Sequence, residues 1–107
     1  MDWYRELYRD GLSRAKADKM RADAEAGGNA FFGYYIVIGE APSHVLELIP
    51  AKEMRKETVR GACRLVVGLA GGREGAVRIA KRITEKVYRE TGDLKIREYF
   101  LGDAGEP

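Results

Sequence analysis

The spacing of apolar residues changes from strand-like to helix-like within the stretch 64–88. In its second half the apolar residues repeat every three or four positions, which is the spacing of one buried helix face, at Ala76, Ala80, Ile83 and Val87. A glycine just beyond the last helical residue is a common stop signal, and Gly92 stands there. The pattern predicts a helix over residues 73–91 that buries this stripe.

Residues 62–70 alternate and so predict a strand that leads into this helix. The larger side chains would lie on one face, at Cys63, Leu65, Val67 and Leu69, and mainly small side chains on the other. The small face would let a helix approach closely. A second strand is predicted over 31–39, FFGYYIVIG, which is almost continuously apolar and rich in aromatic and β-branched residues. Gly33 within it indicates a bulge or the close approach of a neighbour.

The N-terminal segment, residues 2–26, has the apolar spacing of a helix. Asp2 can cap it, and its first four turns carry an apolar face of Trp3, Tyr4, Leu7, Tyr8, Leu12 and Ala15. In its second half alanine alternates with charged residues, and only Met20 could anchor it to a core. Gly27 to Asn29 would end it and could act as a hinge.

Two segments leave the type of element open. Residues 44–49 suit either a short helix capped by Ser43 or an alternating strand, and one or two helical turns are expected over 50–57. Residues 94–100 suit a short helix capped by Asp93 or an edge strand, and 102–107 read as a tail.

These elements together predict one small α+β domain over residues 1–107, a two-layer sandwich. Its sheet would have two to four strands, with 31–39 and 62–70 at the centre and the 73–91 helix packed across one face. The N-terminal helix would cover the other face or the edge, or would detach and serve in oligomer contact.

Composition excludes several classes of protein. Hydrophobic residues make up 45% and charged residues 34%, which is typical of a globular chain, and no apolar run approaches the roughly 20 residues needed to cross a bilayer. The first residues are too charged for a signal peptide, so we expect a cytoplasmic location and no membrane association. One cysteine and one histidine exclude an ordinary zinc site, and we expect neither metal nor cofactor.

The glycine-rich corner between strand and helix is a candidate anion site. Gly71, Gly72 and Arg73 stand where a helix N-terminus would aim backbone N–H groups at a phosphate. The glycine spacing matches neither the dinucleotide fingerprint nor the P-loop. A tight turn with close helix packing is the simpler interpretation, and an anion or nucleotide-phosphate module is the alternative.

The outward face of the predicted helix is basic, at Arg78, Arg82 and Arg89 among others. Acidic residues stand four positions from several of these bases, as on any solvated helix face, and the net charge of the chain is only +2. Nucleic-acid binding through this face is therefore a weaker hypothesis.

No catalytic constellation is visible. Cys63, Ser13, Ser43 and His44 are the candidate nucleophiles and base, and none has an identifiable partner. The aromatic surface of Trp3, Tyr4, Leu7 and Tyr8 instead points to a protein interface. We therefore expect a non-enzymatic accessory or interaction domain that acts as a homo-oligomer, such as a homodimer, with a further protein partner also conceivable.

Overall fold

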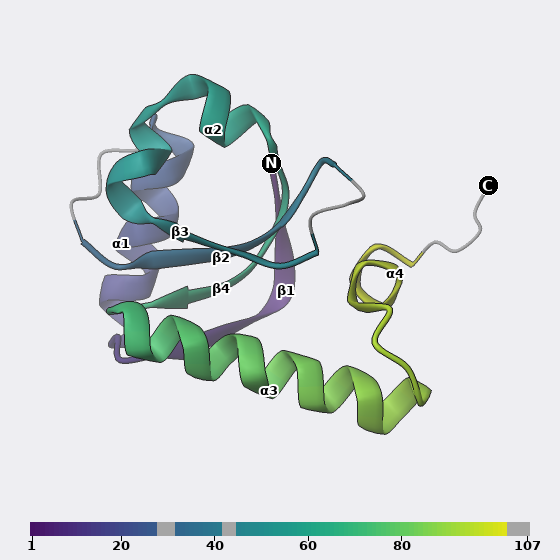
Figure 1. The fold of residues 1–107 in the computed structure, drawn as a ribbon. Coiled ribbons are helices and arrows are strands. Elements are labelled where there is room, and N and C mark those ends of the chain that lie inside the picture. Colours follow the sequence, from purple (N-terminus) through teal and green to yellow (C-terminus); the bar gives the residue numbers. More distant parts are fainter. Residues whose placement is uncertain (28–31, 42–44, 103–107) are drawn as a thin grey trace.

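The computed structural model describes residues 1–27, 32–41 and 45–102, which form a four-stranded sheet with helices on both faces (Figure 1). The sheet order is β1-β4-β2-β3, in which β1 is parallel to β4 while β2 is antiparallel to both of its neighbours. The strands are β1 (Asp2–Asp10), β2 (Tyr34–Gly39), β3 (Glu47–Pro50) and β4 (Cys63–Ala70). The helices are α1 (Arg14–Glu25), the 3-10 helix η1 (Ala51–Arg55), α2 (Glu57–Gly61), α3 (Arg73–Thr91) and α4 (Ile96–Leu101). The predicted small α+β fold is confirmed.

The two strands predicted to be central, β2 and β4, do occupy the centre of the sheet. From Tyr35 to Gly39 every residue of β2 is buried, and so is every residue of β4 except Arg64. This burial explains why both segments are nearly continuous apolar runs. Phe31, the predicted start of the first strand, lies outside the described residues.

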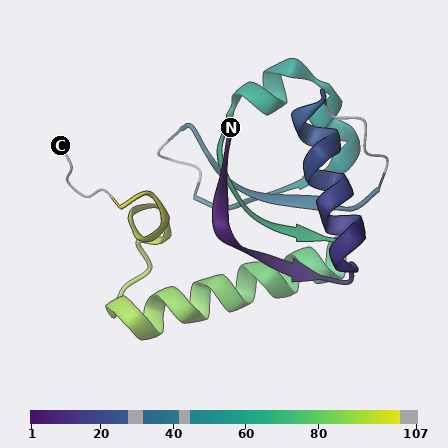
Figure 2. The same ribbon diagram turned by 180° about the vertical axis from the view of Figure 1, so that it is seen from behind.

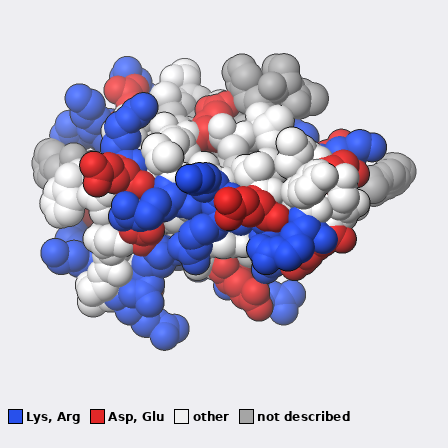
Figure 3. Space-filling model, turned by 60° about the horizontal axis from the view of Figure 1, so that its bottom comes forward, with Lys and Arg blue, Asp and Glu red and all other residues white. Residues whose placement is uncertain are grey.

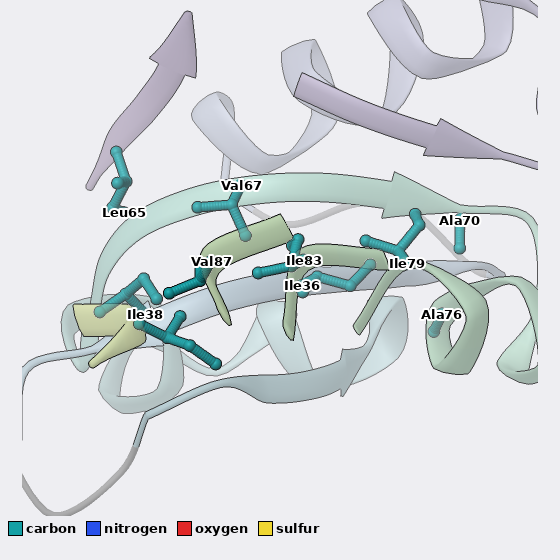
Figure 4. Close-up of a cluster of buried hydrophobic side chains, with 10 residues drawn as sticks. Ile36, Ile38, Leu65, Val67, Ala70, Ala76, Ile79, Ile83 and Val87 are labelled. Atoms are coloured by element: carbon teal, nitrogen blue, oxygen red, sulfur yellow. The ribbon is translucent and has the colours of Figure 1, made fainter. Parts of the chain in front are cut away.

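The α3 helix has the predicted bounds and buries Ala76, Ile83 and Val87 of the predicted stripe, whereas Ala80 is half-buried and Ile79 is buried in addition. Ile79, Ile83 and Val87 are fully buried against Ile36, Ile38 and Val67 of the sheet, as Figure 4 shows. A Cβ added to Gly68 would lie 3.1 Å from the Ile79 side chain, so this glycine allows the helix to pack tightly. Gly92 follows the last helical residue with a left-handed φ of 79°.

The predicted division of β4 into a large and a small face is wrong. Cys63, Val66 and Leu69 pack on the side of α1, whereas Leu65, Val67 and Ala70 pack on the side of α3. The pairing of β4 with β2 shifts register twice, and each shift places an extra β4 residue in the ladder. Strict alternation therefore does not hold along this strand.

The predicted N-terminal helix over 2–26 is wrong in its first half, because residues 2–10 form the edge strand β1. Trp3 and Leu7 pack with the core on the α1 side, and Tyr4 and Tyr8 with the core on the α3 side. A spacing of four keeps a residue on one face of a strand as well as of a helix, so the pattern fitted both. The chain then turns at Gly11, whose φ is 70°.

The second half of that segment is helical, as predicted. Ser13 caps α1 by accepting a hydrogen bond from the Lys16 backbone N–H at 3.1 Å. Met20 and Ala24 are its buried residues, and the buried Tyr35 hydroxyl donates to the Met20 carbonyl at 2.7 Å. Seen from behind in Figure 2, α1 lies across the sheet face opposite α3, and η1 adds Ala51 and Met54 to the same core.

The structure decides the two segments whose type the sequence left open, 44–49 and 94–100. Residues 47–50 form the edge strand β3, the following turns are η1 and α2, and residues 96–101 form α4. Asp93 is not the N-cap of α4, which is Lys95. The Asp93 carboxylate accepts a hydrogen bond from the Lys95 backbone N–H at 3.0 Å, just before the first helical residue. Ser43, His44 and the tail beyond Gly102 lie outside the described residues.

Replacement of Ile83 by alanine tests the contact between α3 and the sheet. Because Ile83 is fully buried, we expect Ile83→Ala to lower the free energy of unfolding by about 2–5 kcal/mol in chemical denaturation. Lys81→Ala, at an exposed position of the same helix, is the matched control and should change it by less than about 0.5 kcal/mol. Equal losses in the two variants would contradict this packing.

Candidate functional site

The predicted anion corner joins β4 to α3 and lies against the turn between β1 and α1. The Gly71 N–H donates to the Asp10 carbonyl at 2.9 Å, and a Cβ on Gly71 would collide with the Gly11 carbonyl oxygen. Gly72 is the N-cap of α3 and has open space around it, and Arg73 is exposed at the first helical position. The two glycines therefore make a close crossing between two turns of the chain.

The carboxylate of Asp10 lies beside the corner and lines the same hollow as Gly72 and Arg73. It receives two hydrogen bonds from the Arg78 guanidinium, at 2.9 and 2.8 Å, and lies beside Gly75 in the first turn of α3. The hydrogen bond from Arg78 holds the pKa of Asp10 below its ordinary value. Glu74 adds a second negative charge to this turn, so the geometry favours a structural role for the corner over anion binding.

The predicted basic face of α3 is only partly available to a ligand. Arg78 is paired with Asp10, and the Arg82 guanidinium lies 5.3 Å from the centre of the Tyr8 ring. Arg89 is exposed near the C-terminal end of the helix. Figure 3 shows acidic side chains interleaved with basic ones over this side of the molecule, so the basic surface is not continuous.

The predicted interface residues lie on β1 and are half-buried within the fold itself. Tyr4 packs edge-on against Phe100 of α4 with ring centroids 4.8 Å apart, and the Arg21 guanidinium lies 4.9 Å from the Trp3 ring centre. Leu7 packs with the core on the α1 side of the sheet, and Tyr8 packs with the core on the α3 side. These side chains cover the domain's own sheet, and whether they also contact a partner stays a prediction.

The β1 strand has a free edge with a groove on either side. It is the outermost strand, and within the described residues no strand pairs with its outer edge. One groove of about 380 Å³, the α3 groove, lies between β1 and Arg82 and Lys86 of α3. Another of about 300 Å³, the α1 groove, lies between β1 and Arg14, Ala17 and Asp18 of α1. The β1 residues 6–9 line both grooves.

Sequence reasoning missed this edge because it placed residues 2–10 on a helix. The sequence analysis did not single out the residues that line the grooves or form the ion pair at this edge, namely Arg5, Glu6, Arg9, Asp10 and Arg14. Two signals could have found the strand: the aromatic content of DWYRELY, and the Gly11-Leu12-Ser13 break followed by a helix.

The reactive residue types have structural roles where the structure describes them. Cys63 is buried, its thiol lies 3.3 Å from the Val59 carbonyl, and burial raises its pKa to about 11, so it is protonated at neutral pH. Ser13 caps α1. Among residues 1–27, 32–41 and 45–102, no three histidine, cysteine or acidic side chains gather in a way that could hold a metal ion.

Comparison of the chain with protein-family models, with curated proteins and with solved structures found no match in any of the three. In the part of the chain that the structure describes, no helix is both long and apolar enough to cross a bilayer.

Substitutions at the two corner glycines test the close crossing. Gly71→Ala places a methyl group against the Gly11 carbonyl, and we expect it to lower the free energy of unfolding by about 1–3 kcal/mol or more. Gly72→Ser is the matched control, because its side chain has space and can cap α3, raising stability by roughly a few tenths of a kcal/mol. A Gly71→Ala variant as stable as the parent would contradict the crossing.

The ion pair between Asp10 and Arg78 makes stability depend on pH. Because the pKa of Asp10 is lowered by folding, its stabilisation is present above the ordinary aspartate pKa of 3.8 and is lost as pH falls below it. We expect Asp10→Asn to lower the urea midpoint at neutral pH, and the difference from the parent to shrink in acid. Asp18→Asn, at an exposed carboxylate without an ion pair to any described residue, should shift the midpoint little at either pH. A difference that is constant with pH would contradict a charge-based role for Asp10.

Proposed function

We propose that this protein is a non-enzymatic interaction domain whose β1 edge accepts an extended segment of a partner protein. The observation that carries the proposal is the free edge of a nine-residue strand with a groove on each side. An added strand gains affinity from backbone hydrogen bonds along such an edge. Its side chains alternate between the two sheet faces, so successive residues would enter the α3 groove and the α1 groove.

Features of β1 also restrict what can pair with it. Its register against β4 shifts between Trp3 and Tyr8, and Arg5, Glu6 and Arg9 are exposed along it. Irregular strands and edge charges are devices by which proteins prevent indiscriminate strand pairing. A partner segment would therefore need complementary charges and would gain its specificity from them.

A second copy of this chain is poorly suited to the β1 edge. In an antiparallel pair of two identical strands, the two-fold axis runs perpendicular to the sheet, and a side chain lies opposite one on the same sheet face. One residue must therefore lie opposite its own copy, and this residue is the centre of the pair. Every centre from Tyr4 to Tyr8 sets like charges opposite each other, which destabilises a strand pair. A centre at Tyr4 sets Asp2 opposite Glu6, one at Arg5 sets Arg5 opposite Arg5, and one at Glu6 sets Glu6 opposite Glu6 and Asp2 opposite Asp10. A centre at Leu7 sets Arg5 opposite Arg9, and one at Tyr8 sets Glu6 opposite Asp10.

The charge pattern thus favours a different protein as the partner at β1. Homo-oligomerisation stays a prediction, as does a cytoplasmic location. Light scattering of the full chain measures the oligomeric state directly.

Amide hydrogen exchange on the full chain tests strand addition. Peptides are selected from a random library of unstructured segments displayed on phage, and exchange is measured with and without a selected peptide. We expect the amides of β1 to gain protection on binding, while those of β3, at the opposite edge of the sheet, serve as the internal control and do not change. Failure to select any binder, or binders that protect β3 or α3 and not β1, would contradict the proposal. So would a dimer of the free protein in which the β1 amides are already protected.

A further inference from the structure

The surface around the β1 edge collects basic charge. The two grooves are lined by five basic side chains and two acidic ones, whereas the rest of the chain has 14 basic and 15 acidic residues. The basic residues are Arg5, Arg9, Arg14, Arg82 and Lys86, and the acidic ones are Glu6 and Asp18. The linings of the two grooves therefore carry an excess of basic side chains, while Asp2 and Asp10 at the two ends of β1 lie outside them.

None of these basic side chains forms an ion pair with a carboxylate among the residues that the structure describes. Arg9 donates to the Leu12 carbonyl at 3.1 Å, and the Arg82 guanidinium lies over the Tyr8 ring and close enough to Asp10 to interact with its carboxylate electrostatically. Arg78, one helical turn from Arg82, shows the contrast because Asp10 neutralises it. The charges at the grooves are thus free to attract an anionic partner.

We propose that the segment bound at the β1 edge is acidic, with aspartate or glutamate at successive positions, an inference that rests on the proposed function. Because successive side chains of an added strand point to opposite faces, one carboxylate would reach Arg82 and Lys86 in the α3 groove, and the next would reach Arg14 in the α1 groove. Arg9 lines both grooves and would contact either.

An extended peptide fits this edge better than a nucleic acid does. A strand edge presents backbone donors and acceptors that another peptide backbone satisfies in a ladder. Nucleic-acid binding would instead use aromatic faces for stacking, and here the Tyr4 ring packs on Phe100 while Tyr8 lies under Arg82. Glu6 and Asp18 also interrupt the basic surface that a phosphate backbone would follow.

The test uses two matched peptides with the full chain. One is a ten-residue unstructured peptide of glutamates and valines, and the other carries lysine at every glutamate position. We expect the acidic peptide to bind with an affinity that falls as salt rises, to protect the β1 amides, and the lysine peptide not to bind. Arg82→Glu with Lys86→Glu should weaken acidic-peptide binding roughly tenfold or more. Lys81→Glu with Arg89→Glu, on the same helix but lining neither groove, is the matched control and should leave the affinity unchanged.

The contrary results separate this inference from the proposed function. Equal binding of the lysine peptide, or selection of uncharged peptides that protect β1 while the acidic peptide does not bind, would overturn the acidic preference and leave strand addition standing. Binding of the acidic peptide without protection of β1 would overturn strand addition itself. Salt-dependent binding of an oligothymidine that both double variants weaken equally would overturn the inference in favour of a nucleic-acid surface on α3.

Discussion

Side chains from both faces of β2 are fully buried, Ile36 and Ile38 under α3, and Tyr35 and Val37 under α1 and η1. Each such side chain contributes about 1.5–3 kcal/mol relative to an exposed position, most of it offset by the entropy cost of ordering the chain. A strand with two apolar faces cannot leave either face to water. The helices on both sides are therefore required by the sheet, and their positions follow from it.

The same requirement produces the hollows beside β1. Because α3 and α1 must cover the central strands from opposite sides, both also flank the edge strand, and their solvent-facing residues line the grooves. The close crossing of Gly11 and Gly71, together with the Asp10–Arg78 ion pair, fixes the end of β1 against the start of α3. The edge strand β1 is thus held in place by contacts with the rest of the domain.

The parts of the fold that the sequence predicted are those with one dominant spacing. The stripe through Ile83 can only be one helix face, and Gly92 marks its end, so the bounds of α3 were predicted correctly. Trp3, Tyr4, Leu7 and Tyr8 form two pairs four residues apart, which suits a helix and equally a strand covered on both faces, and the helix was the wrong choice. Strand alternation failed in β4 because register shifts depend on the neighbouring strand.

The candidate site could be predicted only in part for the same reason. The corner at Gly71 was visible because glycines beside a helix start form a local pattern. The residue that packs against it, Asp10, comes from 61 residues away in the chain, and this contact could not be predicted while residues 2–10 were placed on a helix. The grooves exist only once β1 lies beside β4, a parallel pairing between distant segments that no local spacing encodes.

The parallel pairing of β1 with β4 also has a consequence for synthesis of the chain. During translation β1 leaves the ribosome before the other described strands, whereas β4, its only neighbour among them, is the last of them to be made. Loop closure over so long a separation is slow, and unpaired strands are prone to aggregation. The charged residues Arg5, Glu6 and Arg9 of β1 would therefore act first in the nascent chain. They would keep the unpaired β1 segment soluble until β4 emerges from the ribosome.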